Sequence, residues 1–228
     1  MSGGDARAAV IVAMVAATAF ALLTVLVAAG WPPLIRLDRA VADGADSYAA
    51  SHPGWVWAMR VWTNAAGPAV WRVLVVLLGA WLLVRRAVLP AVVVVAALML
   101  AWLLSSVVKV AVGRARPAVP HPYANPAGMS FPSGHAATSV VACGLLLLLV
   151  LPVLDGRWRT AAWTMAVAVP ATVGYTRVGL DVHWTSDVVG GWLLGIAVIA
   201  TANAALTALG ATATAPISRV TGDGPSRR

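Results

Sequence analysis

Long apolar runs separated by short polar segments are the feature that most constrains the fold of this 228-residue chain. The first run, residues 8–30, has only Thr18 and Thr24 as polar side chains. At a helical rise of about 1.5 Å per residue, such a run can cross the ~30 Å hydrocarbon core of a bilayer. Helices satisfy their own backbone hydrogen bonds in lipid, so the pattern predicts a bundle of transmembrane helices.

The sequence predicts one all-α domain, residues 1–215, with six such spans. The composition agrees, because 61% of the residues are hydrophobic and only 11% are charged, against about 25% charged in soluble domains. A cleaved signal peptide is the competing interpretation of the first run, but signal-peptide cores typically hold about 7–15 apolar residues. The tail, residues 216–228, is expected to be disordered. The six expected spans are about residues 8–30, 68–84, 87–108, 136–154, 161–176 and 188–209.

Between the first two spans, residues 31–67 interrupt the apolar pattern with prolines and aspartates. Trp55, Met59 and Trp62 recur there at i, i+4 and i+7, the spacing of an amphipathic helix. Because tryptophan favours the membrane–water interface, we expect an interfacial helical segment. It either packs over the end of the bundle or guides lipid headgroups toward a site. His52 lies outside any motif and is expected to be solvated.

Two further features concern packing. Cys143, the only cysteine, lies within an apolar run and is expected to be a small packing residue. A lone cysteine also excludes an intramolecular disulfide and a cysteine metal cluster. Gly191 and Gly195, four residues apart in the sixth expected span, suit the close packing of two helices.

The net charge of +8 does not indicate nucleic-acid binding. The arginines are scattered at the ends of the apolar runs, where they can face lipid headgroups or mark cytoplasmic loops. We therefore expect the lipid bilayer as a partner and no nucleic acid. The sequence carries no signal for an oligomeric state.

Polar residues between positions 109 and 187 are of the types that a phosphate site needs. His183 and Asp187 are four residues apart, so that on a helix the carboxylate can hold an imidazole N–H. Such a pair supplies a nucleophile or base with its orienting partner. Asp181 is expected to cap the helix that carries His183. Ser133 and Gly134 precede a long apolar run, where a helix should begin and offer free N–H groups to an anion.

His135 would lie in the first turn of that helix, beside a bound anion. Three cations, Lys109, Arg116 and Arg177, would balance the charge of a phosphate, and each arginine can form a bidentate contact. Lys109 is the only lysine of the chain. Because these cations repel a metal ion, we expect no metal and no other cofactor.

In their order and spacing, these residues resemble the three-part signature of the type 2 phosphatidic acid phosphatase family, which shares its site with the vanadium haloperoxidases. The first part, Lys-x6-Arg-Pro, corresponds to Lys109–Pro117. The second, Pro-Ser-Gly-His, corresponds to Pro132–His135. The third, Ser-Arg-x5-His-x3-Asp, corresponds to residues 176–187, with Thr176 in place of the serine.

The resemblance implies a metal-independent phosphatase that acts on a membrane lipid through a phosphohistidine. His183 would attack phosphorus, Asp187 would orient it, and His135 would protonate the leaving oxygen and then activate water. Undecaprenyl diphosphate and a glycerolipid such as phosphatidic acid or phosphatidylglycerol phosphate both fit as substrates. The phosphoryl oxygens would be held by Lys109, Arg116, Ser133, Gly134 and Arg177, with main-chain amides serving at Ser133 and Gly134.

Three other functions remain open. A lipid phosphotransferase would pass the phosphoryl group to an alcohol instead of water. A vanadium haloperoxidase would bind vanadate in the same pocket, but such enzymes are typically soluble and larger. A transporter also fits six spans, although the charged residues gather in loops and not near the midplane, where transporter sites lie.

Six spans place both termini on one side of the membrane. Two spans separate the loops that hold the signature, so these loops emerge together on the other side. Basic residues are denser in the short loops of the terminal side, such as Arg85–Arg86 and Arg157–Arg159. The positive-inside rule therefore predicts cytoplasmic termini in the plasma membrane and a site on the exoplasmic face. Five basic residues on the site's side are assigned no role in the site, namely Arg36, Arg39, Arg60, Arg72 and Arg114.

Overall fold

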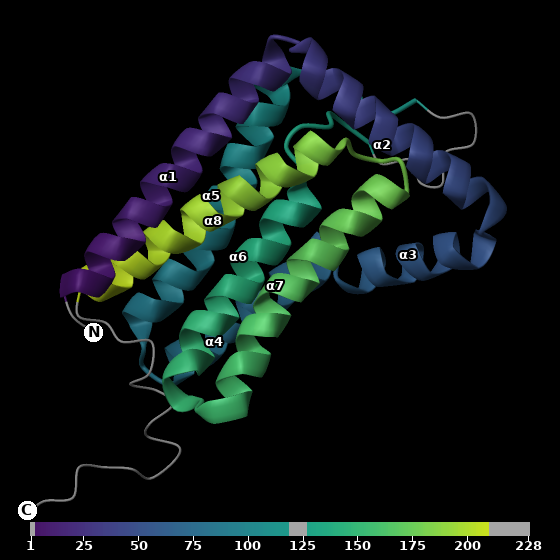
Figure 1. Ribbon diagram of the computed structural model, residues 1–228. Helices are drawn as coiled ribbons and strands as arrows, with labels where there is room; N and C mark the ends of the chain where they lie inside the picture. The colour runs from purple at the N-terminus through teal and green to yellow at the C-terminus, as the bar shows by residue number, and fades with distance from the viewer. Residues whose placement is uncertain (1–2, 119–126, 210–228) are drawn as a thin grey trace, which may run out of the picture.

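The computed structural model describes residues 3–118 and 127–209, and all regular structure in these ranges is helical (Figure 1). The all-α prediction is therefore confirmed for this part of the chain, and the tail at 216–228 lies outside the described residues. The helices, in order, are α1 (Gly3–Ala28), α2 (Pro32–Ser51), α3 (Pro53–Ala65), α4 (Pro68–Val84), α5 (Val88–Val112), α6 (Gly134–Val150), the 3-10 helix η1 (Leu151–Val153), α7 (Gly156–Gly179) and α8 (Thr185–Ala208).

Helix α6 is the centre of a bundle formed with α1, α4, α5, α7 and α8. It contacts α4, α5, α7 and α8, and α1 packs along α8 over most of its length (Figure 1). The core contains buried side chains from four of these helices, among them Val75, Val94, Val141 and Leu194. Cys143 is also buried, in agreement with its expected packing role.

Helices α2 and α3 lie at the end of the bundle where α5 ends and α6 and α8 begin (Figure 1). Helix α2 contacts α7 and α8, and α3 contacts α7. Trp55 and Met59 pack against a small buried cluster that includes Leu180 and Val182, next to His183 in the sequence. The amphipathic face of α3 is therefore turned toward the loop between α7 and α8. That this segment lies along a membrane surface remains a prediction.

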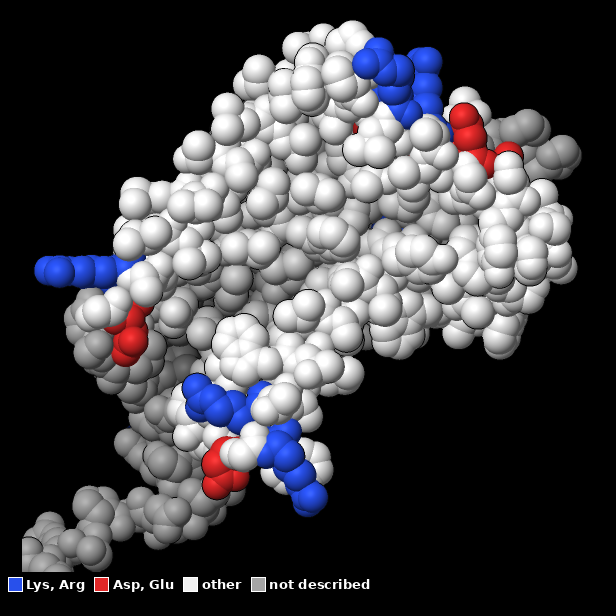
Figure 2. Space-filling view, viewed as in Figure 1, with Lys and Arg blue, Asp and Glu red and all other residues white. Residues whose placement is uncertain are grey.

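Within residues 3–118 and 127–209, five helical stretches are long and apolar enough to cross a membrane. On the face in Figure 2, charged side chains gather at the two ends of the bundle, and the broad surface between them is almost entirely uncharged. Such a surface suits hydrocarbon, and we conclude that this is a multi-pass membrane protein. Helix α7 covers the expected span at 161–176, but it is not among the five. The five are Gly4–Ala28, Pro53–Val84, Val88–Val112, Gly134–Val153 and Thr185–Ala208.

Proline and glycine set several helix boundaries near the site. Pro32, Pro53 and Pro68 are the first residues of α2, α3 and α4, where a missing N–H group costs nothing. Gly113 ends α5 with a positive φ of 64°, which a residue with a Cβ adopts only under strain. This turn redirects the chain from the end of α5 toward Arg114 and Arg116.

Helices α6 and α8 approach closely at glycines, as the sequence predicts. A Cβ atom added to Gly191 would lie 2.5 Å from the carbonyl oxygen of Ser133, and one added to Gly195 would lie 2.7 Å from Cβ of Val140. These glycines therefore set the distance between the first two turns of α6 and the first half of α8.

Gly191→Ala should lower the thermal unfolding temperature of the detergent-purified protein. The added methyl group must displace main-chain atoms, and overpacking typically costs about 1–3 kcal/mol. Gly44→Ala in α2 is the control, because a Cβ there meets no atom within 4 Å. Equal unfolding temperatures for Gly191→Ala and Gly44→Ala would contradict this packing argument.

Candidate active site

A cavity of about 380 Å³ lies among α4, α5, α6 and the end of α7. The structure brings six of the eight candidate residues to its wall, although they come from segments far apart in the sequence. The other two, Ser133 and Asp187, are fully buried beside it. The six are Lys109, Arg116, Gly134, His135, Arg177 and His183.

Lys109 and Arg116 fasten the loops around the cavity. Lys109, in the last turn of α5, donates from Nζ to the carbonyl oxygens of Met129 at 2.8 Å and Ser130 at 3.1 Å. Arg116 donates to the carbonyl oxygens of Gly128 at 3.0 Å and Val182 at 2.5 Å. Burial lowers the pKa of Arg116 from its ordinary value, and the charge of Asp187 opposes this shift. Hydrogen bonds to main-chain carbonyl oxygens therefore hold both cations at the cavity.

The start of α6 provides the expected helix terminus. Ser133 occupies the N-cap position, and its Oγ accepts a hydrogen bond from the amide of Ala136 at 3.5 Å. Gly134 and His135 form the first turn and line the cavity. The sequence places the Ser133 amide in the anion site, whereas the structure pairs this N–H with the carbonyl oxygen of Asp187 at 2.9 Å. Ser133 thus joins the start of α6 to the start of α8.

Arg177 is an almost completely buried cation, with 5% of its surface exposed. It lies in the last turn of α7 and donates from Nη1 to Oγ1 of Thr63 on α3 at 2.9 Å. Its Nε has no hydrogen-bond partner among the described residues. A buried N–H group without a partner is costly, and a bound anion would satisfy it.

His183 lies in the loop before α8, and not on the helix as its spacing from Asp187 suggests. Helix α8 begins at Thr185, so of the pair His183 and Asp187 only Asp187 lies within the helix, in its first turn. The two side chains still meet, with Nδ1 of His183 3.3 Å from Oδ2 of Asp187. The expectation that Asp181 caps this helix is wrong, because Trp184 holds the N-cap position and its amide donates to Asp187 Oδ2 at 2.9 Å. The Asp187 carboxylate caps the helix from within.

The surroundings of the His183 ring favour its neutral form. Burial lowers its pKa to about 4, and the nearby charges of Arg116 and Arg177 act in the same direction, while the hydrogen bond and charge of Asp187 oppose them. Because Asp187 accepts at Nδ1, the neutral ring carries its proton there and keeps a lone pair on Nε2. Nε2 lies 3.2 Å from Nη1 of Arg116, which lines the same cavity.

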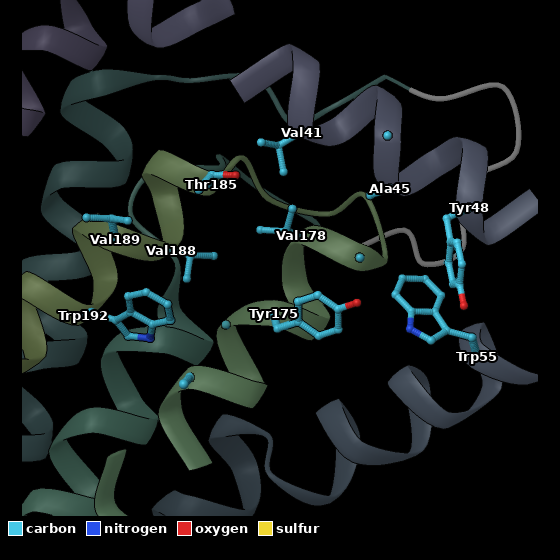
Figure 3. A pocket seen from close by; sticks show the side chains of 14 residues that line it. Val41, Ala45, Tyr48, Trp55, Tyr175, Val178, Thr185, Val188, Val189 and Trp192 are labelled. Carbon is cyan, nitrogen blue, oxygen red and sulfur yellow. The ribbon is translucent and has the colours of Figure 1, made fainter. Parts of the chain in front are cut away.

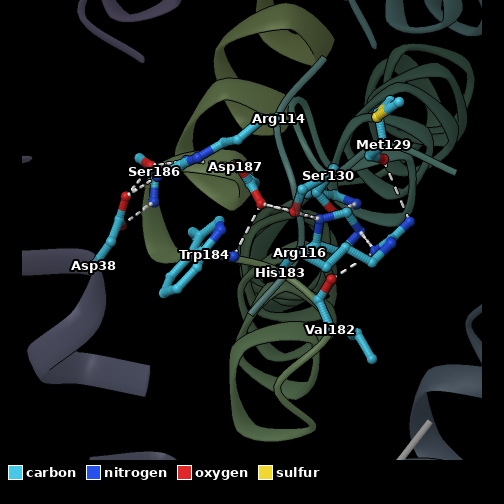
Figure 4. A network of polar contacts seen from close by, with 12 residues as sticks. Asp38, Arg114, Arg116, Met129, Ser130, Val182, His183, Trp184, Ser186 and Asp187 are labelled. Carbon is cyan, nitrogen blue, oxygen red and sulfur yellow. Dashed lines mark hydrogen bonds and ion pairs between the residues drawn. The ribbon is translucent and has the colours of Figure 1, made fainter. Parts of the chain in front are cut away.

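A polar network that the signature does not contain surrounds Asp187 (Figure 4). Ser130 donates from Oγ to Oδ2 of Asp187. Arg114 donates from Nη1 to Oδ1 of Asp187 at 2.7 Å and to Ser186 Oγ at 2.6 Å. Its Nη2 is 2.6 Å from Oδ2 of Asp38 on α2. The sequence places Arg114 outside the site, and the structure corrects this. Its position two residues before Arg116 was the available signal, whereas Asp38 gave none.

Arg72 is a second basic residue that the sequence leaves outside the site. It lies on α4 and lines the cavity, where it donates from Nε to the carbonyl oxygen of Pro68 at 3.1 Å. The wall of this cavity also has an apolar part, formed by Leu98, Ala101 and Trp102 of α5. The lining of this one cavity therefore combines cationic side chains with apolar ones.

A second cavity, of about 420 Å³, lies between α2, α7 and α8 (Figure 3). Aromatic side chains surround it, including Tyr48, Trp55, Tyr175 and Trp192. None of the eight candidate residues lines this cavity. The chemistry of the signature therefore belongs to the smaller, cationic cavity. Within the described ranges, no group of three His, Cys, Asp or Glu residues is placed to hold a metal ion.

The fold and this cavity define a helical, multi-pass membrane protein with a cationic site at one end of its bundle. The family model of the PAP2 superfamily matches residues 90–210, more than half of the chain. The chain therefore belongs to the PAP2 superfamily, which confirms the resemblance seen in the signature.

Two relatives match shorter segments. A stretch of 70 residues is 39% identical to an undecaprenyl-diphosphatase of Sulfolobus acidocaldarius and covers 31% of this chain and 30% of the relative. A stretch of 97 residues is 35% identical to phosphatidylglycerophosphatase B of Bacillus subtilis and covers 41% of this chain and 47% of the relative. The matched segments thus span about a third and about half of these relatives.

The fold also matches a solved structure, the crystal structure of a transmembrane PAP2 type phosphatidylglycerolphosphate phosphatase from Bacillus subtilis. The TM-score is 0.72 at 23% sequence identity, and the alignment covers 81% of this chain and 92% of the other. The two proteins therefore share their fold.

The lowered pKa of His183 predicts a loss of stability in acid. An unfolded histidine titrates near pH 6.5, whereas folded His183 has a pKa of about 4. As the pH falls between these values, the unfolded chain takes up a proton that the folded protein does not bind, so the free energy of unfolding decreases. This contribution is complete above about pH 6.5 and is lost at about pH 4.

Thermal unfolding measured from about pH 7.5 to pH 4 tests this expectation. His183→Gln should show a weaker loss of stability in acid than the wild type. His52→Gln, at an exposed position between α2 and α3, is the matched control and should keep the wild-type profile. Superimposable profiles for the wild type and His183→Gln would show that the pKa of His183 is not lowered.

Proposed function

We propose that this protein is a membrane-embedded lipid phosphate phosphatase that works through a phosphohistidine and needs no metal ion. The observation that carries the proposal is the meeting of His183, His135 and three cations around one cavity. The names of both relatives, undecaprenyl-diphosphatase and phosphatidylglycerophosphatase B, support the same chemical class. A phosphatase site needs a nucleophile, a proton donor and positive charge, and this cavity contains candidates for all three.

In the first step, Nε2 of neutral His183 attacks phosphorus. The N–P bond forms while the bond from phosphorus to the leaving oxygen breaks, and His135 gives a proton to that oxygen. Oδ2 of Asp187, which lies 3.3 Å from Nδ1 of His183 in the structure, accepts a hydrogen bond from the Nδ1 proton and stabilises the positive ring that forms. The lowered pKa of His183 supports this role, because the nucleophile must begin without a proton on Nε2.

In the second step, neutral His135 takes a proton from water as the water attacks phosphorus. The N–P bond breaks, and the electron pair returns to Nε2 of His183, so both histidines regain their starting states. Lys109, Arg116 and Arg177 bind the phosphoryl oxygens, together with the free amides at the start of α6. Arg177 suits this role because its buried Nε has no hydrogen-bond partner among the described residues.

The substrate in this proposal is a lipid phosphate whose tails stay in the bilayer. The apolar wall of the cavity, with Leu98 and Trp102, gives the chain next to the phosphate an apolar surface. Undecaprenyl diphosphate and phosphatidylglycerol phosphate are the two substrate classes that the relatives' names support. Phosphatidic acid presents the same phosphomonoester chemistry.

The proposed topology has six spans, with α7 as the fifth in order after α1, α4, α5 and α6. Its 24 residues reach about 36 Å as a helix, and it packs along α6. The two loops that hold the signature, before α6 and before α8, then face the exoplasmic side of the plasma membrane. The loop between α6 and α7, with Arg157 and Arg159, faces the cytoplasm.

The activity test measures phosphate release by the detergent-purified protein in EDTA. The three lipids are undecaprenyl diphosphate, phosphatidylglycerol phosphate and phosphatidic acid. We expect release by the wild type, a loss of at least ~1,000-fold in His183→Ala, and a loss of about 100- to 10,000-fold in His135→Ala. His52→Ala, an exposed histidine away from the cavity, should keep wild-type activity.

The outcomes separate the competing functions. Release from none of the three lipids, or full activity in His183→Ala, would refute the phosphatase proposal. Phosphate that appears on an added alcohol and not in solution would indicate a phosphotransferase. The lipid with the highest kcat/KM identifies the substrate class.

Single cysteines test the topology. In a Cys143→Ser background, Ala115→Cys should react with a membrane-impermeant maleimide in intact cells, and Asp155→Cys should react only after permeabilisation. Ala115 marks the site's end of the bundle, since its carbonyl oxygen accepts from Trp184 Nε1 at 2.9 Å. Labelling of both positions in intact cells would mean that neither α6 nor α7, which both link the site's end of the bundle to Asp155, crosses the membrane as proposed.

A further inference from the structure

We propose that Asp38 and Arg114 form a clamp that positions Asp187, and through it His183, for phosphoryl transfer. This inference rests on the proposed function, because it assigns the two residues to the reaction proposed for the cavity. Neither residue belongs to the three-part signature, and neither lines the cavity. Both are therefore positioning residues and do not contact the substrate.

Arg114 lies between two buried carboxylates (Figure 4). One guanidinium nitrogen is 2.6 Å from Oδ2 of Asp38, and the other is 2.7 Å from Oδ1 of Asp187. Asp38 is 1% exposed and Asp187 is fully buried. Buried carboxylates need such partners, and a forked guanidinium can serve two of them at once. The Cζ atom of Arg114 also lies 5.5 Å from the centroid of the Trp184 ring, within range of a cation–π interaction.

Asp38 also fixes the first turn of α8. Its Oδ1 accepts from the main-chain N–H of Ser186 at 2.9 Å, and its Oδ2 accepts from Ser186 Oγ. Ser186 directly precedes Asp187, and its Oγ accepts in turn from Arg114 at 2.6 Å. The clamp thus holds both the backbone and the carboxylate at the start of the helix.

The two oxygens of Asp187 have separate partners. Oδ1 is bound by Arg114, whereas Oδ2 faces Ser130, the amide of Trp184 and Nδ1 of His183. With Oδ1 fixed, the carboxylate cannot rotate away from the imidazole. The orientation of the His183 ring therefore depends on the contact between Arg114 and Oδ1, the oxygen of Asp187 that does not face the ring.

The charges of the clamp are also balanced for the reaction. Arg114 alone would cancel the negative charge of Asp187 and so disfavour the positive ring formed on His183. Asp38 offsets Arg114, which leaves one net negative charge in the trio to stabilise that ring. Arg116 and Arg177 lie near His183 on the cavity side and both oppose its positive charge, so this compensation matters.

Asp38→Asn and Arg114→Gln test the clamp, with Asp43→Asn and Arg39→Gln on the exposed face of α2 as matched controls. We expect kcat to fall about 10- to 100-fold in the clamp variants, the usual effect of removing an outer partner of a catalytic group. KM and the inhibition constant of orthovanadate, a phosphate analogue, should change less than about twofold, because the cavity wall is intact. The double variant should be no slower than Arg114→Gln, because the two residues act as one unit.

Hydrogen exchange of the peptide that spans residues 184–187 gives a readout independent of turnover. The amides of Trp184 and Ser186 should exchange faster in both clamp variants than in the wild type and the two controls, since their acceptors are held by the clamp. Unchanged exchange would overturn the clamp, as would a wild-type kcat or a parallel rise of KM and the orthovanadate constant. If the wild type releases no phosphate or His183→Ala remains active, the proposed function fails. The hydrogen-exchange rates then still test whether Asp38 and Arg114 hold the start of α8.

Discussion

The burial of one carboxylate, that of Asp187, organises the functional end of this protein. A fully buried carboxylate is stable only when its oxygens are satisfied, and here Arg114, Ser130, Trp184 and His183 share that task. The backbone of the same residue accepts from Ser133 at the start of α6. The loop before α8, the start of α6 and the ring of His183 therefore meet at a single residue, and α2 joins this network through Asp38.

The architecture separates two requirements of a membrane enzyme. The bundle around α6 provides an apolar exterior and a packed interior, while the helix ends provide charge and hydrogen-bonding groups. Because helix starts carry free N–H groups and helix ends adjoin water, the proposed phosphate site needs no charged groups at the membrane midplane. The apolar wall on α5 continues from the cationic end of the cavity, as expected if the substrate is a lipid phosphate.

The family match includes the site residues after residue 90 but not those before it. The family model matches residues 90–210, which include every signature residue and also Arg114. Asp38 lies before this range, and Thr63, which binds Arg177, does so as well. The helices α2 and α3 thus add supports to the site that the signature does not include.

The sequence by itself determined the helices and the chemical inventory. Hydropathy is a local property, so the expected span at 68–84 coincides with α4, and the Ser133–Gly134 helix start is where the sequence predicts it. The signature likewise identified six residues that line one cavity. Local patterns were sufficient for these predictions because each concerns neighbouring residues or a known spacing.

Only the tertiary structure decided how these residues are supported. His183 lies in a loop, the Ser133 amide is used by Asp187, and Arg114 joins Asp38 to Asp187. Each of these depends on which segments become neighbours in space, and an isolated Asp38 in a polar stretch gives no sign of a partner on α8. The physical reason is that charge pairing in a buried site acts over a few ångströms in space, whatever the distance along the chain.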